Sequence, residues 1–121
     1  MKQGKKLSGG RYHKPRKKKK YETVRQPRIV KLKETKKKTV RTRGGNKKTV
    51  LLGCDTINII DPKTKKAKAV KIKNVTETPS NVFLARQNIL TKGAIIETEA
   101  GKAKVTNRPS QEGCVQGILV E

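Results

Sequence analysis

The sequence contains no tryptophan, one phenylalanine and two tyrosines in 121 residues. Proteins that grip single-stranded nucleic acid through RNA-recognition motifs or OB-folds stack bases on aromatic side chains carried by strands. Here Tyr12 and Tyr21 both lie in a basic N-terminal stretch outside any predicted strand, and Phe83 is the third aromatic. We therefore expect the folded part of the chain not to read unstacked bases by stacking.

The side chains that enzymes and metal sites need are also scarce. His13 is the only histidine, and it lies beside Lys14 in the basic stretch, where no pocket or orienting partner is expected. We interpret it as one more donor to phosphates or bases, not as a general base. The acidic residues show no metal-ligand spacing, and no Walker loop, Rossmann fingerprint or zinc motif is present. We expect no enzyme, no catalytic residue, no cofactor, no metal and no small-molecule substrate.

Long apolar runs and paired cysteines are missing as well. No window approaches the ~18 consecutive apolar residues of a membrane span, and the basic N-terminus is not followed by the apolar segment of a signal peptide. Cys54 and Cys114 stand far apart without a Cys-x-x-Cys motif. We expect a cytoplasmic protein with reduced structural thiols and no membrane contact, although the sequence alone leaves a disulfide open.

Positive charge is in excess, and it is concentrated in one half of the chain. The net charge is +23, of which residues 1–49 carry +19 (21 Lys and Arg against 2 acids) and residues 50–121 carry +4 (11 against 7). Residues 1–21 hold ten Lys or Arg and no acid. Such a stretch repels itself and has almost no apolar surface to offset the entropy of ordering. We expect residues 1–27 to form an extension that is disordered alone and orders against nucleic acid.

Candidate RNA-binding residues fall into three clusters. They combine cations that neutralise phosphate with glycines that let the backbone approach it closely. The first cluster is Lys5, Lys6, Ser8, Gly9, Gly10 and Arg11. The second is His13, Lys14, Arg16, Lys17, Lys18, Lys19 and Lys20, followed by Arg25. The third, at a predicted hairpin tip, is Arg41, Arg43, Gly44, Gly45, Asn46, Lys47 and Lys48.

From residue 28 onward, short runs of alternating apolar and polar residues indicate strands. These runs cover residues 28–33, 39–43, 48–52, 56–60, 68–75, 94–98, 102–106 and 114–120. Only residues 81–87 suggest a helix, with Ser80 as the predicted N-cap. Strands this short, with no helices to cover a sheet, favour closure, because closure removes exposed edges. We predict an all-β domain over residues 28–121: a small, closed or nearly closed barrel of antiparallel strands with at most one short helix.

Four blocks of the sequence, which include the basic clusters, resemble the archaeal and eukaryotic small-subunit ribosomal protein family eight-e. The matching blocks are residues 5–10 and 20–22, residues 40–48, residues 88–98 and residues 101–106. One departure is visible, since Val24, Arg25, Gln26 and Pro27 stand where the family usually has Gly-Arg-x-Pro. The chain also lacks the long insertion of eukaryotic members and so resembles the archaeal form.

The resemblance implies a β-barrel with a basic extension, bound as a structural component to small-subunit rRNA beside neighbouring ribosomal proteins. It implies a monomer when free, a location on the cytoplasmic ribosome and no catalytic activity. Two other readings of the charge remain open at this point. One is an architectural, chromatin-type DNA-binding protein. The other is a basic module for acidic proteins or anionic lipids, against which the lack of an apolar helical face in the extension argues.

Overall fold

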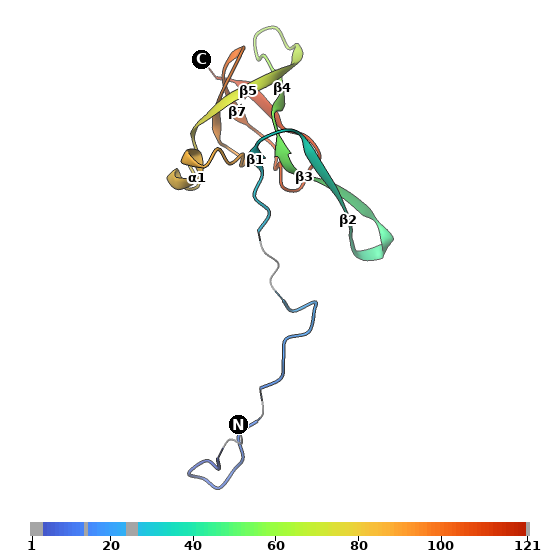
Figure 1. The fold of residues 1–121 in the computed structure, drawn as a ribbon, viewed down its shortest axis with the longest axis vertical. Helices are drawn as coiled ribbons and strands as arrows, with labels where there is room; N and C mark the ends of the chain where they lie inside the picture. Colours follow the sequence, from blue (N-terminus) through green and yellow to red (C-terminus); the bar gives the residue numbers. More distant parts are fainter. Residues whose placement is uncertain (1–3, 14, 24–26, 121) are drawn as a thin grey trace.

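The computed structural model describes residues 4–13, 15–23 and 27–120. The predicted RNA contacts Lys14 and Arg25, and the departure at residues 24–26, lie outside the described residues. Figure 1 shows the folded body at one end and the segments 4–13 and 15–23 extending away from it. Among the described residues, each hydrogen bond made by residues 4–13 or 15–23 has both of its partners within these two segments.

The body is built on a closed barrel of five strands. In barrel order these strands are β4 (Thr56–Ile60), β5 (Ala67–Glu77), β6 (Ile95–Thr98), β7 (Gly101–Val105) and β8 (Gln116–Leu119). Each strand is antiparallel to the next, and β8 closes the ring by pairing with β4 in parallel. The all-β closed barrel is therefore confirmed, but its strands are not all antiparallel. A meander with an odd number of strands returns in its starting direction, so the closing pair must be parallel.

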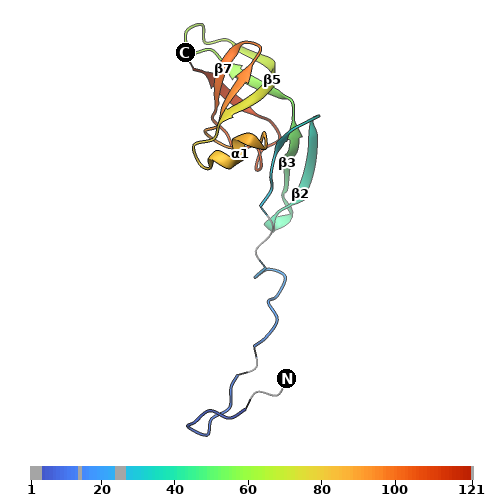
Figure 2. The same ribbon diagram turned by 60° about the vertical axis from the view of Figure 1, so that its left-hand side comes forward.

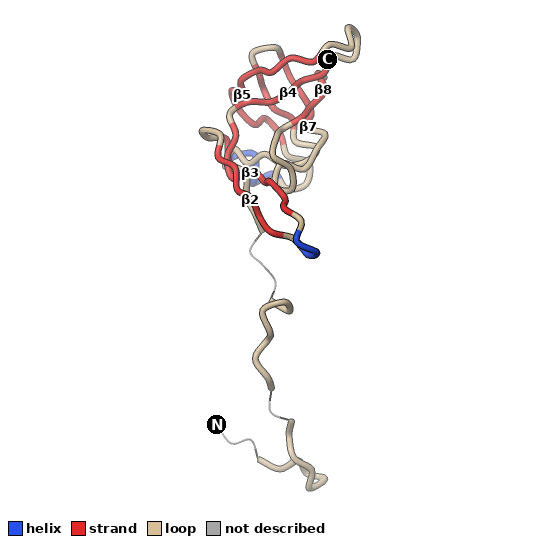
Figure 3. Tube along the Cα trace, turned by 90° about the vertical axis from the view of Figure 1, so that its right-hand side faces the viewer, coloured by secondary structure: helices blue, strands red, loops and turns tan. Residues whose placement is uncertain are grey.

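A second, three-stranded sheet lies beside the barrel. Its order is β1 (Lys31–Leu32), β3 (Lys47–Cys54) and β2 (Lys36–Arg41), with β1 parallel and β2 antiparallel to β3. The β2–β3 hairpin projects from the body, and its tip lies well away from the barrel in two orthogonal views (Figures 1 and 3). The turn is a short 3-10 element, η1 (Arg43–Gly45). Gly44 and Gly45 have φ of 78° and 80°, which confirms the predicted glycine turn.

Alternation along the strands places one set of side chains in the core. Ile57 and Ile59 of β4 are buried while their neighbours on the same strand are exposed, and Ile72 and Val75 do the same in β5. The bulge between Ile72 and Asn74 shifts the alternation by one residue, so that Val75 points inward. Val30 is buried and Leu32 packs against the core, as predicted for this pair.

The chain around β1 is hydrogen-bonded to the loop between α1 and β6. Leu90 N–H donates to the carbonyl of Val30 at 2.8 Å, and Leu32 N–H donates to the carbonyl of Asn88 at 2.9 Å. These bonds fix the entry of the chain from the N-terminal segments onto the barrel.

One short helix, α1 (Val82–Arg86), lies at the end of the barrel nearer the N-terminal segments (Figure 2). Its N-cap is Asn81 and not the predicted Ser80, because the Asn81 side-chain oxygen accepts from the N–H of Phe83 at 3.0 Å. Val82 and Phe83 are exposed on this helix. Within the described residues no helix is long and apolar enough to span a membrane.

The two cysteines occupy different environments, and both thiols are free. Cys54 is buried at the end of β3, where its thiol donates to the carbonyl of Thr56 at 3.0 Å. Cys114 is partly exposed in the loop before β8, and its sulfur accepts from the Gln116 amide at 3.7 Å. This agrees with the reduced, structural role expected from the sequence.

Candidate nucleic-acid interface

The first cluster forms a small loop. Lys6 N–H donates to the carbonyl of Gly10 at 2.8 Å, and Gly9 N–H donates back to the carbonyl of Lys6 at 2.9 Å. Gly9 has a φ of 78°, which explains the glycine at this place in the turn. A β-bridge joins Lys5 to Arg11 and so brings two cations together at the base of the loop. The loop is a compact basic element, and all of its residues, Ser8 and Gly10 included, are exposed.

A tyrosine lies against this loop. The Lys6 ammonium lies 5.5 Å from the centroid of the Tyr12 ring, within the range of a cation–π contact. Such a contact at an exposed site contributes about 0.5–1 kcal/mol at most. Tyr12 therefore supports the position of Lys6, and its ring keeps one face for other contacts.

The second cluster forms another loop, closed by Glu22, an acidic residue of the 20–22 block to which the sequence assigned no role in binding. The Arg16 guanidinium donates two hydrogen bonds to the Glu22 carboxylate, at 2.8 and 2.6 Å. Glu22 also accepts from the Lys19 N–H at 3.0 Å. Arg16 was predicted as a phosphate donor, and in the structure its exposed guanidinium also has a carboxylate partner.

These contacts stabilise both groups in their charged forms. The Arg16 hydrogen bonds, followed by the Lys19 N–H, hold the pKa of Glu22 below its ordinary value. The Glu22 carboxylate in turn raises the pKa of Arg16. Between the two partners the chain carries the consecutive, exposed lysines Lys17, Lys18, Lys19 and Lys20.

The third cluster is the exposed tip of the β2–β3 hairpin. Thr42 N–H donates to the Asn46 carbonyl at 2.7 Å, and the Thr42 hydroxyl donates to the same oxygen at 2.9 Å. Arg41 and Lys47 lie opposite each other, next to this turn. Arg43 was expected to share a strand face with Arg41, but it belongs to the η1 turn. The tip therefore points cations outward from both strands and from the turn between them.

Three further lysines of this hairpin were missed by the sequence analysis. Lys36, Lys37 and Lys38 form the start of β2 and are all exposed. They continue the basic ribbon from the tip toward the body. The run of three lysines just before the predicted strand 39–43 is the signal that could have identified them, had the strand been extended backward.

The loop before β8 braces β3 from its middle to a position close to the turn. The Lys48 ammonium donates to the side-chain oxygen of Gln111, and Leu51 N–H donates to the carbonyl of Pro109 at 3.3 Å. Asn107 secures this loop, because its amide donates to Glu112 at 2.9 Å and to the Cys114 carbonyl at 2.8 Å. The loop thus holds β3 as far as Lys48, one residue from the Arg41–Lys47 pair that flanks the turn.

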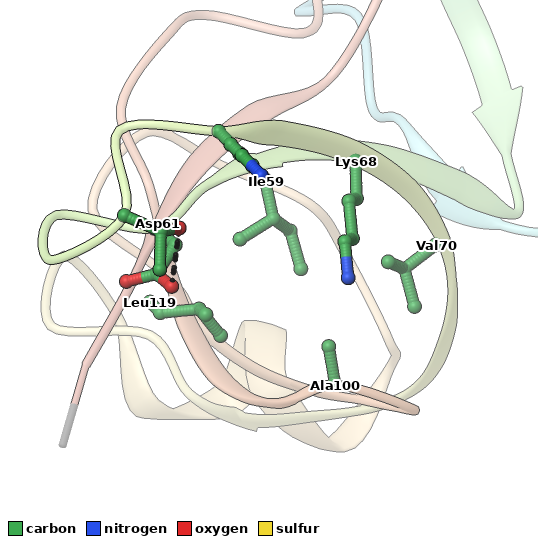
Figure 4. A pocket seen from close by; sticks show the side chains of 8 residues that line it. Ile59, Asp61, Lys68, Val70, Ala100 and Leu119 are labelled. Carbon is green, nitrogen blue, oxygen red and sulfur yellow. Dashed lines mark hydrogen bonds between the residues drawn. The ribbon is translucent and has the colours of Figure 1, made fainter.

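The other end of the barrel, where β4 turns into β5, is open and holds a cavity of about 400 Å³ (Figure 4). Ile59, Val70 and Leu119 form its apolar lining, and the Lys68 side chain extends across the opening. The Asp61 carboxylate at the rim accepts from the Thr64 hydroxyl at 2.8 Å and the Lys63 N–H at 3.0 Å, and these bonds lower its pKa. Both bonds lie within the turn between β4 and β5 and so stabilise that turn.

In the described part of the chain, no three His, Cys, Asp or Glu side chains lie close enough together to hold a metal ion. The features that stand out are therefore the two loops of the N-terminal segments and the β2–β3 hairpin. All three present cations on exposed turns whose backbones are fixed by local hydrogen bonds. This arrangement suits phosphate and shape recognition, in which backbone contacts set the position of the protein.

Comparison with known proteins agrees with this description. The family model described as ribosomal protein S8e matches residues 1–120. A protein of Methanocorpusculum labreanum named small ribosomal subunit protein eS8 is 45% identical over 116 residues, which cover 96% of this chain and 93% of that protein. Proteins of the same name from Methanococcus aeolicus and Nanoarchaeum equitans are 50% and 46% identical, and each match covers 95% of this chain and 91% of the relative.

Proposed function

The chain belongs to the ribosomal protein S8e family, and from this membership we propose that it is a structural component of the small ribosomal subunit that binds small-subunit rRNA. The family is one of ribosomal proteins, and its relatives are named as proteins of the small ribosomal subunit. The chain is accordingly a structural protein and not an enzyme. The proposed site is the cytoplasmic ribosome, with rRNA and neighbouring ribosomal proteins as partners and a monomer as the free state.

The observation that carries the rRNA-binding proposal is the near absence of counter-charge around three exposed basic turns. Residues 1–49 hold 21 Lys and Arg but only Glu22 and Glu34 as acids. Within the described residues, the one ion pair is Arg16–Glu22. The remaining cations of the first loop, the lysine run and the hairpin thus have no carboxylate to neutralise them. A dense polyanion is the partner that would do so.

The proposed division of labour follows the fold. Residues 28–121 form the domain that docks on the rRNA surface, with the β2–β3 hairpin as its contact. Residues 1–27 form the extension that enters between rRNA helices and neutralises phosphates there. The entropy of ordering this extension is lost only on binding, which makes binding to arbitrary RNA weak and binding to its own site tight.

Sucrose-gradient sedimentation of cell lysate tests this function. The full chain is expected to migrate with the small subunit through a moderately high-salt wash, and a variant lacking residues 1–20 is expected to be washed off. If about ten cations meet phosphates, the logarithm of the affinity falls against the logarithm of salt with a slope of about −7 to −9. A full chain that stays at the top of the gradient, or follows DNA after RNase treatment, contradicts the proposal and favours the chromatin-type alternative.

A charge-matched pair of variants separates the proposed contacts from general attraction. One variant replaces Lys17, Lys18, Lys19 and Lys20 with serine. The other replaces four exposed lysines of the barrel strand β5 and its preceding turn, Lys66, Lys68, Lys71 and Lys73. Both lose four positive charges, so equal effects on ribosome association would mean that only net charge matters. We expect a clearly larger loss for the first variant.

A further inference from the structure

Glu22 is the only acidic residue among residues 1–33. In a segment that binds a polyanion, a carboxylate is repelled by every nearby phosphate and should weaken binding. Its presence in the middle of the most basic part of the chain therefore needs a compensating role, and its contacts show one.

Glu22 ties together two points of the chain that flank the lysine run. Its carboxylate accepts both nitrogens of the Arg16 fork, at 2.8 and 2.6 Å, and the Lys19 N–H at 3.0 Å. The backbone adds to this closure, since Glu22 N–H donates to the Lys19 carbonyl at 2.9 Å and the Thr23 hydroxyl donates to the same carbonyl at 3.2 Å. A bidentate guanidinium–carboxylate pair fixes direction as well as distance. We call this closed segment, residues 16–23, the clasp.

The clasp determines how the lysine run is presented. The ring closed by Arg16 and Glu22 contains Lys17 to Lys20, all of them exposed. A flexible chain could place four lysines against any polyanion, whereas a closed loop presents them in one arrangement. The clasp therefore holds the four lysines in a defined arrangement.

The contribution of the clasp depends on what covers it. The Arg16 side chain is 65% exposed and that of Glu22 is 28% exposed, and ion pairs this open to water are weak on their own. When RNA packs against the loop and excludes water, the same hydrogen bonds act at a lower local dielectric and become stronger. The clasp is thus most stable in the bound state that it fits.

We propose that Glu22 is a positioning residue for RNA binding, which closes the 16–23 clasp and thereby gives the extension its preference for a shaped rRNA site over an arbitrary polyanion. This inference rests on the proposed function. It opposes the expectation from charge alone, according to which removal of an acid from a +23 chain strengthens binding to every RNA.

The test compares E22Q with E34Q in the full-length protein, by fluorescence anisotropy against two probes. The probes are a small-subunit rRNA transcript from the source organism and poly(U). Each variant removes one acid, but the structure gives the Glu34 side chain no hydrogen bond or ion pair to any described residue. We expect E22Q to bind the rRNA about tenfold more weakly than wild type, the size of effect for loss of one charge-assisted hydrogen bond. E34Q should bind both probes slightly more tightly than wild type does. E22Q should likewise bind poly(U) slightly more tightly than wild type.

R16K provides a second variant that leaves the net charge unchanged. Lysine cannot form the two-pronged contact, so R16K should weaken rRNA binding in the same direction as E22Q and leave poly(U) binding unchanged. The double variant R16K/E22Q should lose no more than E22Q alone, because both changes remove the same contact.

The outcomes separate the two proposals. If wild type prefers rRNA to poly(U) and E22Q binds rRNA as tightly as E34Q does, the clasp has no positioning role and the inference is overturned while the proposed function stands. If wild type binds both probes equally, the proposed function fails, and the inference fails with it. Loss of rRNA binding in E22Q and R16K, with poly(U) binding retained, supports both.

Discussion

Arg41 lies directly opposite Lys47 in the β2–β3 ladder, so that two cations face each other beside the hairpin turn. Like charges in this position destabilise a strand pair by about 0.2–1 kcal/mol relative to a neutral pair. A phosphate bound between the two side chains would replace this repulsion with two attractions. The hairpin tip thus brings two like charges together, and under the proposed function an RNA phosphate would bind between them.

We predict that Lys47→Thr makes the free hairpin more stable and the RNA complex weaker. Threonine removes the facing charge and is a good strand former, so the Thr42 N–H, which bonds to the Asn46 carbonyl, should exchange with solvent more slowly. The expected gain is about 0.2–1 kcal/mol of local stability, measured by amide hydrogen exchange in low salt. High salt should shrink the difference between variant and wild type.

Lys37→Thr is the matched control for this change. Lys37 is exposed on the same hairpin but faces Leu51, so its removal takes away the same charge without relieving a facing cation. Equal protection of Thr42 in the two variants would show that the gain comes from threonine or from net charge and not from the Arg41–Lys47 pair.

A second prediction concerns the closing strand of the barrel. A side-chain carbon at Gly117 would lie 2.9 Å from the Ile57 methyl and 2.9 Å from the Lys104 carbonyl oxygen, and the latter is backbone that cannot rotate away. We expect Gly117→Ala to lower the free energy of unfolding by about 1–3 kcal/mol, the usual range for overpacking a core. Urea denaturation followed by circular dichroism measures it.

Gly113→Ala gives a graded comparison in the same part of the chain. Its added carbon would meet the Thr49 side chain at 3.2 Å, a group that can shift by a few tenths of an ångström. The loss of stability should therefore be smaller than at Gly117. An equal or larger loss at Gly113 would mean that backbone contact at Gly117 is not what requires glycine there.

The third prediction concerns acid sensitivity. The Thr35 hydroxyl donates to the Asp55 carboxylate at 2.6 Å, and this bond is the main reason that the pKa of Asp55 lies below its ordinary value of 3.8. The Asp55 N–H and the charge of Lys71 act in the same direction. Because the folded state holds the proton less tightly than the unfolded state, Asp55 stabilises the fold above pH 3.8 and loses this effect as the pH falls below it.

Thr35→Val should raise the pKa of Asp55 toward 3.8, as measured by NMR titration of its side-chain carboxyl. The stability difference between wild type and variant should narrow as the pH falls from neutral to well below that value. Thr39→Val is the control. Thr39 lies on β2, four residues after Thr35, and its hydroxyl has no hydrogen bond to any described residue. An unchanged Asp55 titration in Thr35→Val would contradict the assignment.

The strands could be predicted from the sequence because their signal is local. Each of the eight predicted runs overlaps one of the eight strands of the described chain, and the predicted 56–60 strand coincides with β4. The start of β2 was missed because Lys36, Lys37 and Lys38 carry no alternation. The closing pair of β4 and β8 was missed, because alternation says which face a residue takes but not which strand lies beside it. Ser80 and Asn81 are both residue types that suit an N-cap, and only the backbone geometry selects Asn81 over the predicted Ser80.

The candidate interface was predictable in part for a similar reason. Clusters of lysine and arginine and the paired glycines of the hairpin turn are visible as composition, and the structure places them on exposed turns. The role of Glu22 was not visible, because one acid six residues from Arg16 fits no periodic pattern of helix or strand. A contact of this kind depends on a loop closing, which is a property of the folded segment and not of residue spacing.

The parallel closure by β8 also sets an order of events during synthesis. Residues 116–118 pair with residues 58–60, so the ring is incomplete until almost all of the barrel sequence has been made. Chains are synthesised from the N-terminus, and contacts this distant in sequence form late. The basic extension is therefore exposed, fully charged, before the domain that carries it exists. The most basic segment of a nascent chain is therefore available to polyanions while the barrel is still unfolded. The barrel can close only when β8 has been synthesised.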